Sequence, residues 1–208
     1  MRYVPRLITF VCLAFVCAAP AYSAQYLFET VRVSPVGTVL GPGMDGPSES
    51  PPNASLGTGY GTALYDDVAH TLGLNASFSG LLGTTTASHI HAPTANPFLL
   101  TAGVATTTPS FAGFPLGVTS GTFSNTLDLT QSSSWNPSYV TANGGTTAGA
   151  EAAFRSALFA NKAYWNIHTT VVPGGEIRGF MNLVPEPATA SLIGMGIAAI
   201  GCLARRRR

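Results

Sequence analysis

The sequence is poor in charge, and away from its ends it has no cysteine. Only 9% of the 208 residues are charged, and the formal net charge is +1. A protein that binds nucleic acid would show a basic surface, so this balance gives no support to a nucleic-acid partner. Apolar residues make up 46% of the chain, which excludes general disorder. The length allows one domain with extra segments, or two small domains.

The few charges are distributed unevenly. Six of the ten basic residues are arginines close to the two ends of the chain, at positions 2, 6 and 205–208. Residues 25–184 instead carry four basic and eight acidic residues, a net charge of −4. All three cysteines also lie outside this central segment. The segment must therefore be stable without disulfides, and its 160 residues suffice for a hydrophobic core.

Residues 1–24 have the pattern of a secretory signal peptide. Arg2 and Arg6 precede the apolar run Leu7–Ala18, and small residues follow through Ala24. The apolar run is too short to span a bilayer comfortably, which favours a cleaved signal over a retained membrane helix. Cleavage after Ser23 and cleavage after Ala24 both fit the pattern.

The other end predicts a membrane helix over about residues 188–204. Ala188–Leu203 contains no charged residue, and its 16 residues would form a helix of about 24 Å, slightly less than the ~30 Å hydrocarbon core. Snorkelling arginines can cover the difference, and an arginine cluster holds this end in the cytoplasm. The flanking residues are Pro185, Glu186 and Pro187 before the apolar run and Arg205, Arg206, Arg207 and Arg208 after it.

This order of Pro-Glu-Pro, short apolar segment and terminal arginines, over residues 185–208, resembles the PEP-CTERM sorting signal. The resemblance implies processing by an exosortase-type membrane peptidase and attachment to the inner membrane through the C-terminal helix. It also implies delivery to the cell surface or the extracellular matrix of a Gram-negative bacterium. The alternative is an ordinary tail anchor that follows a Pro-rich linker.

The central segment, residues 25–184, predicts an all-β domain. Short stretches of alternating apolar and polar residues are separated by Gly, Pro and Asn, as in an antiparallel sandwich or barrel. Thr147–Lys162 breaks this rhythm with strong helix formers and predicts one short helix with a threonine cap. Ser34–Gly57 predicts a long irregular connection. The expected strands cover residues 26–33, 59–65, 70–78, 88–92, 118–129, 163–170 and 176–183.

The last two expected strands form a hairpin whose register can be predicted. Residues paired across two strands lie on the same face, so apolar residues must face apolar residues. This match places Trp165 on a different face from Glu176 and Arg178. The predicted polar face carries His168 together with a network that holds the hairpin, formed by Asn166, Glu176 and Arg178.

Three blocks of the central segment resemble the CHRD domain, which is named for chordin. The blocks are residues 49–59, residues 88–93, and residues 164–179, which contain His-Thr followed by Pro-Gly-Gly-Glu-Ile-Arg-Gly. The resemblance implies an immunoglobulin-like or barrel-like fold and no established enzymatic activity. Two departures are Trp165, where smaller β-branched residues are typical, and a Ser/Thr-rich insert at residues 130–147.

Three histidines supply the only pattern that indicates site chemistry. On a strand, His89 and His91 lie on one face, and His168 on another strand can supply a third nitrogen. Such a set suits copper or zinc. The alternative is that these histidines hydrogen-bond backbone groups or Glu176 and only support the fold.

Two functions therefore remain open. The first is a non-enzymatic binding or structural module, with exopolysaccharide or surface proteins as partners, no catalytic residues and no cofactor. The second is a copper- or zinc-binding extracellular protein with redox activity at the three histidines.

Overall fold

The computed structural model describes residues 25–185. The expected signal peptide and the expected membrane helix lie outside the described residues. Within residues 25–185, neither α-helix is long and apolar enough to cross a membrane. The strands are β1 (Gln25–Val33), β2 (Val39–Pro42), β3 (Met44–Asp45), β4 (Thr58–Asp66), β5 (Thr71–Ser79), β6 (Thr85–His91), β7 (Gly121–Asp128), β8 (Tyr164–Thr169) and β9 (Ile177–Leu183). The helices are η1 (Ser132–Ser134), α1 (Pro137–Ala142) and α2 (Thr147–Phe159). The predicted all-β class is confirmed.

The alternation of the sequence determines which side of each strand faces the core. In β5, the even-numbered residues from Leu72 to Phe78 are buried, and the residues between them are exposed or half-buried. β5 pairs along its length with β4 and with β7, in an unbroken antiparallel register. The predicted period of two therefore holds through this layer.

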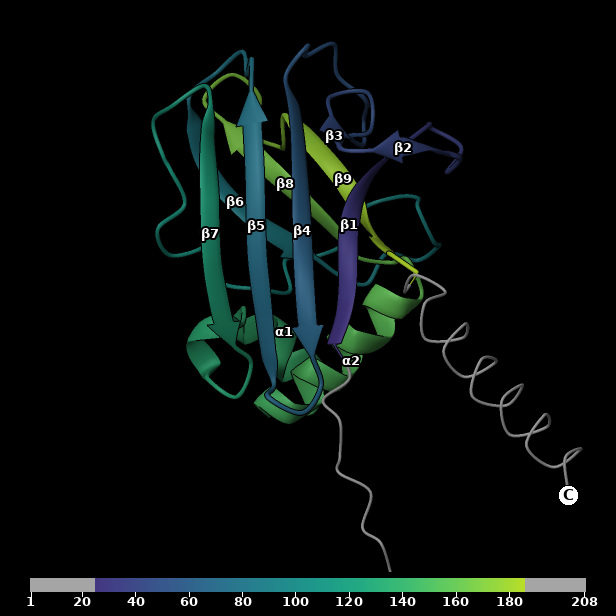
Figure 1. The fold of residues 1–208 in the computed structure, drawn as a ribbon, viewed down its shortest axis with the longest axis vertical. Coiled ribbons are helices and arrows are strands. Elements are labelled where there is room, and N and C mark those ends of the chain that lie inside the picture. Colours follow the sequence, from purple (N-terminus) through teal and green to yellow (C-terminus); the bar gives the residue numbers. More distant parts are fainter. Residues whose placement is uncertain (1–24, 186–208) are drawn as a thin grey trace, which may run out of the picture.

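All nine strands belong to one antiparallel sheet that folds over into two layers. Along the sheet, the long strands follow the order β7, β5, β4, β1, β9, β8, β6. Strand β1 connects the two layers, because its first half pairs with β4 and its second half pairs with β9. In Figure 1, β7, β5, β4 and β1 lie in front of β6, β8 and β9. The core lies between the layers, and its largest fully buried side chains include Trp165, Phe28, Phe111, Phe154 and Leu72.

Two helices cover one end of the sandwich (Figure 1). The predicted helix is α2, and Thr146 caps it by accepting a hydrogen bond from the Gly149 N–H. The shorter helix α1 was not predicted. At its start, the Asn136 side chain accepts a hydrogen bond from the Ser138 N–H, and Pro137 is the first helical residue. This combination favours a helix start. The Ser/Thr-rich composition of this insert obscured the cap.

The long connection after β1 is mostly irregular, as expected, but it contains β2 and β3. Strand β3 is inserted between β4 and β9, where Asp45 lies opposite Arg178. In the final hairpin, Ile167 lies opposite Ile177 and Asn166 lies opposite Arg178. The predicted match of apolar residues is therefore confirmed, and Arg178 lies on a different face from Trp165 as expected, but the expected position of Glu176 on that polar face is wrong.

Candidate metal site

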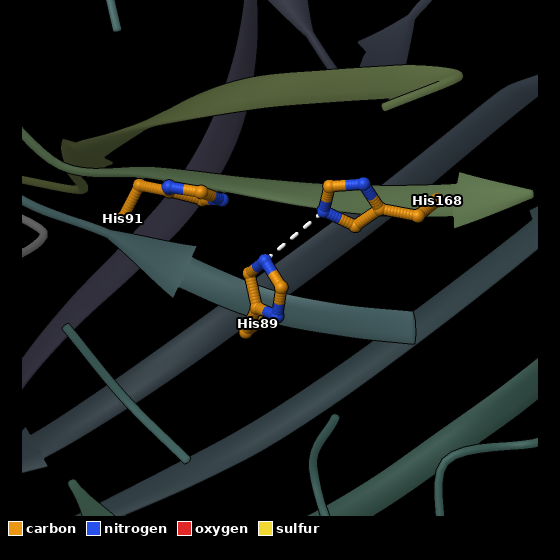
Figure 2. A group of neighbouring side chains, drawn as sticks. All are labelled: His89, His91 and His168. Carbon is orange, nitrogen blue, oxygen red and sulfur yellow. Dashed lines mark hydrogen bonds between the residues drawn. The ribbon is translucent and has the colours of Figure 1, made fainter. Parts of the chain in front are cut away.

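His89, His91 and His168 converge on the outer face of the layer formed by β6, β8 and β9. One ring nitrogen from each lies within 4.8 Å of the others. The Nε2 atoms of His89 and His168 are 3.0 Å apart. Figure 2 shows these two rings pointing toward each other from neighbouring strands. The sheet brings together residues almost 80 positions apart in the sequence.

The other ring nitrogen of each histidine faces a backbone carbonyl. The Nδ1 atoms of His89, His91 and His168 each lie 2.8 Å from an oxygen, that of Pro109, Ala102 and Pro173 respectively. A carbonyl oxygen can only accept, so each Nδ1 carries the hydrogen. In the neutral ring, Nε2 is then left with its lone pair. Three lone pairs therefore face one small volume.

Burial keeps these rings neutral at pH 7. It lowers the pKa of His89 and the pKa of His91 to about 4 each, and it also lowers the pKa of His168. A charged imidazole would lose its hydration in this environment, which is why burial favours the neutral form. The ring of His91 also stacks on Tyr164, with centroids 4.6 Å apart, which fixes its orientation. Neutral, oriented imidazoles are the form that binds metal ions.

The donor set fits copper or zinc better than calcium or magnesium. The latter two prefer oxygen ligands, whereas imidazole nitrogen suits copper and zinc. Two nitrogens each 2.0–2.1 Å from a tetrahedral ion would lie about 3.4 Å apart. The Nε2 atoms of His89 and His168 are 3.0 Å apart, and all three nitrogens lie within 4.8 Å of one another, so a tetrahedral ion needs small shifts of these rings. The carbonyl partners at Nδ1 are also the usual outer contacts of metal-binding histidines.

Beside the histidines lies a buried ion pair that the sequence analysis did not predict in full. Arg178 is 3% exposed, donates Nε to the Ser48 carbonyl, and lies 3.8 Å from a carboxylate oxygen of Glu49. Burial raises the pKa of Glu49 to about 7, although Arg178 opposes that shift. Glu49 begins the first block that resembles the CHRD family, but no periodicity distinguished it as a site residue.

The structure separates Glu176 from the polar network expected for it. Asn166 and Arg178 lie side by side, but the Glu176 carboxylate instead accepts hydrogen bonds from elsewhere. Its donors are the hydroxyls of Ser55 and Thr169, each at 2.6 Å, and the N–H groups of Leu82 and Gly83. Gly175, with φ +127°, precedes Glu176 and interrupts the alternation at the hairpin turn.

These bonds also determine the charge of Glu176. Burial alone would raise its pKa, but the four donors outweigh burial and hold the pKa below its usual value. Glu176 therefore ties together three loops at one end of the sandwich. Its carboxylate is not the Nδ1 partner of any of the three clustered histidines, since each Nδ1 bonds to a carbonyl.

The sorting residues fall mostly outside the described part of the chain. Pro185 is the last described residue and is exposed. Glu186, Pro187 and Arg205, Arg206, Arg207 and Arg208 lie beyond it.

Comparison with known families matches residues 43–181 to the CHRD domain and residues 183–208 to the PEP-CTERM protein-sorting motif. Neither a curated protein nor a solved structure matches the chain. The sorting motif indicates export, processing by exosortase and membrane anchoring at the surface of a Gram-negative bacterium. Neither family description names an enzymatic activity. The CHRD match covers more than half of the 208 residues of the chain, and the chain therefore belongs to the CHRD family.

Proposed function

We propose that this exported surface protein is a non-enzymatic metal-binding module, which holds one copper or zinc ion through the Nε2 atoms of His89, His91 and His168. The observation that carries the proposal is the set of three Nδ1–carbonyl hydrogen bonds, which turn all three Nε2 lone pairs toward one point. Copper binds such a site more tightly than zinc when both are present, following the usual order of divalent ions.

A purely structural role explains less of the geometry. Histidines that only support loops need their Nδ1 hydrogen bonds, but they do not need their Nε2 atoms to meet. His91 Nε2 is buried without a hydrogen-bond partner, and two Nε2 acceptors face each other at 3.0 Å in His89 and His168. Such a contact is unfavourable unless the two atoms share a proton or bind the same cation. Burial disfavours the proton, which leaves a metal ion as the better occupant.

The test is metal stoichiometry of the purified full-length protein. After dialysis against Cu²⁺ or Zn²⁺ at pH 7.5, we expect about one ion per chain by mass spectrometry of the metal. His89→Ala and His168→Ala should each lower affinity at least a hundredfold in competition with a chelator, because each removes one of three ligands. His70→Asn is the matched control and should retain the ion. Wild-type protein that retains no ion after reconstitution would contradict the proposal.

A further inference from the structure

Unpartnered buried acceptors gather around the histidine cluster. Among residues 25–185, five buried side-chain atoms have no hydrogen-bond partner, and three of them belong to this face of the sheet. These three are His91 Nε2, Asn166 Oδ1 and Glu49 Oε1. His91 Nε2 and Asn166 Oδ1 are acceptors, since His91 carries its hydrogen on Nδ1, and Glu49 Oε1 accepts whenever its carboxyl is ionised. Buried acceptors are normally satisfied, so this group indicates an occupant that brings positive charge and hydrogen-bond donors.

Asn166 is at the centre of this group. In β8 it lies opposite His89 of β6 and opposite Arg178 of β9, and its side chain is adjacent to both His91 and Glu49. It is only 2% exposed. The metal ligands are therefore on one side of Asn166, and the Glu49–Arg178 ion pair is on the other.

The hairpin turn holds Asn166 in this position. A Cβ atom at Gly175 would lie 2.7 Å from Asn166 Nδ2 and 2.7 Å from Glu49 Oε1, closer than such contacts normally approach. The backbone of the turn therefore packs directly on the amide and the carboxyl, and only glycine permits this approach. Asn166 is thus a fixed group at the edge of the metal site.

The proposed ion has room for another ligand. In the described part of the chain, the group of converging ligands contains three histidines and no cysteine or carboxylate. Sites with three protein ligands keep a water molecule or substrate in the fourth position. Three neutral imidazoles leave the charge of the ion uncompensated, which makes a bound water a strong hydrogen-bond donor. His168 is partly exposed, so the histidine cluster borders solvent on that side.

We infer that the ion carries an exchangeable water in this fourth position and that Asn166 Oδ1 accepts a hydrogen bond from that water. Asn166 is then a positioning residue, and the buried Glu49–Arg178 pair fixes its orientation. The ligand class follows: small molecules that replace water on copper or zinc, such as monodentate anions, can reach the ion. The inference depends on the proposed metal site and adds to it an open, hydrogen-bonded position.

The experiment uses full-length protein loaded with Cu²⁺ and azide as the probe. Azide that replaces the water should produce a new absorption band and change the electron paramagnetic resonance spectrum. Asn166→Ala should keep one ion per chain, lower copper affinity 10- to 100-fold, and shift azide affinity several-fold. Asn166→Ser keeps an acceptor oxygen, so its copper affinity and its azide affinity should lie between those of Asn166→Ala and wild type. Asn75→Ala, on an exposed position of β5, is the matched control and should behave as wild type.

The outcomes separate the two proposals. Wild-type protein without copper would overturn the proposed function itself. Copper-loaded protein whose spectra do not respond to azide would overturn the open position alone. Azide binding that is equal in wild type and both Asn166 variants would overturn the role of Asn166. If Asn166→Ala does not fold by circular dichroism, Asn166→Ser decides, because a purely structural effect would leave azide affinity unchanged in folded, loaded protein.

Discussion

The four histidines of the protein occupy two sites that shift the pKa of the imidazole in opposite directions. In the cluster of His89, His91 and His168, burial lowers the pKa values and each Nδ1 faces a carbonyl. The side chain of His70 is about half exposed, and its Nδ1 lies 2.9 and 3.0 Å from the two carboxylate oxygens of Glu151. That hydrogen bond and the negative charge raise the pKa of His70. Burial and the partner of Nδ1 thus decide in which direction the pKa of a histidine shifts.

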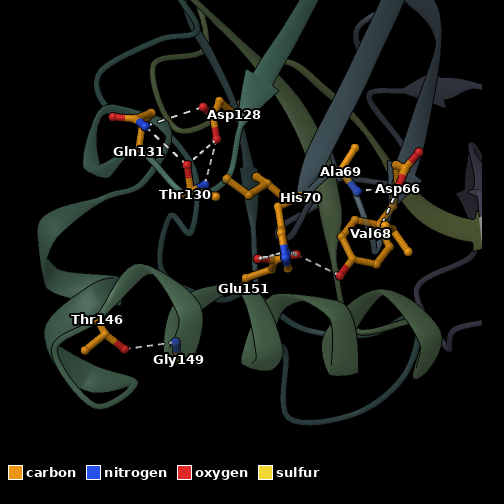
Figure 3. A network of polar contacts seen from close by, with 12 residues as sticks. Asp66, Val68, Ala69, His70, Asp128, Thr130, Gln131, Thr146, Gly149 and Glu151 are labelled. Carbon is orange, nitrogen blue, oxygen red and sulfur yellow. Dashed lines mark hydrogen bonds and ion pairs between the residues drawn. The ribbon is translucent and has the colours of Figure 1, made fainter. Parts of the chain in front are cut away.

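The His70 site supports the fold. Figure 3 shows His70 at the turn between β4 and β5, above the carboxylate of Glu151 on α2. The buried Tyr65 hydroxyl donates to the same carboxylate at 2.9 Å. His70 has φ +53°, a conformation in which Asn and Gly are favoured. The site therefore connects the sheet to the helix that covers its end, and only one imidazole takes part.

The largest expected contrast between the two sites is in metal-dependent stability. An ion that binds only the folded protein raises the free energy of unfolding by about 2.7 kcal/mol when its free concentration is a hundred times its Kd. At the same Zn²⁺ concentration we expect this gain in wild type and in His70→Asn, and at most about 0.4 kcal/mol in His168→Ala if its affinity falls at least a hundredfold, by urea unfolding with and without Zn²⁺. Equal gains in all three proteins would mean that the ion binds outside the cluster.

Removing the carboxylate should affect the second site more than removing its imidazole. Glu151→Ala leaves the buried Tyr65 hydroxyl without its partner, which costs about 1–3 kcal/mol. His70→Asn should cost much less, because the His70 side chain is half exposed and asparagine tolerates the positive φ. Urea unfolding of both variants at pH 7 measures the difference. A larger loss in His70→Asn would show that the imidazole, and not Tyr65, accounts for the strength of this connection.

The sequence predicted the histidine cluster better than its surroundings. A period of two places His89 and His91 on one face, and the apolar match in the last hairpin places Asn166 opposite Arg178. No local pattern could predict the Nδ1 partners, because Ala102 and Pro109 belong to loops that pack onto β6. Long-range packing of this kind depends on the whole fold.

Glu176 and Glu49 illustrate the same limit. Alternation extrapolated through the turn assigned Glu176 to the wrong side, because Gly175 changes the direction of the chain there. Glu49 lies in an irregular connection, where no period applies, and only the folded structure brings it to Arg178. Most of the strands and the helix α2 followed from periodicity, whereas the loops that complete the site did not.

The two sites should also differ in the sign of their pH dependence. The raised pKa of His70 means that its pairing stabilises the fold fully below the ordinary value of 6.5 and that this contribution is lost as pH rises through the raised value. The lowered pKa values of the cluster act in the other direction. Below pH 6.5 the unfolded chain binds protons that the folded cluster does not, so stability falls as pH decreases toward about 4.

Urea unfolding between pH 4.5 and 8.5, with a chelator present, separates these two contributions. The stability advantage of wild type over His70→Asn should shrink as pH rises through the raised pKa of His70, because the imidazole then loses the positive charge that Glu151 attracts. The advantage of wild type over His89→Ala should instead shrink as pH falls, because alanine has no proton to gain on unfolding. Two advantages that change with pH in the same direction would contradict the opposite pKa shifts of His70 and of the histidine cluster.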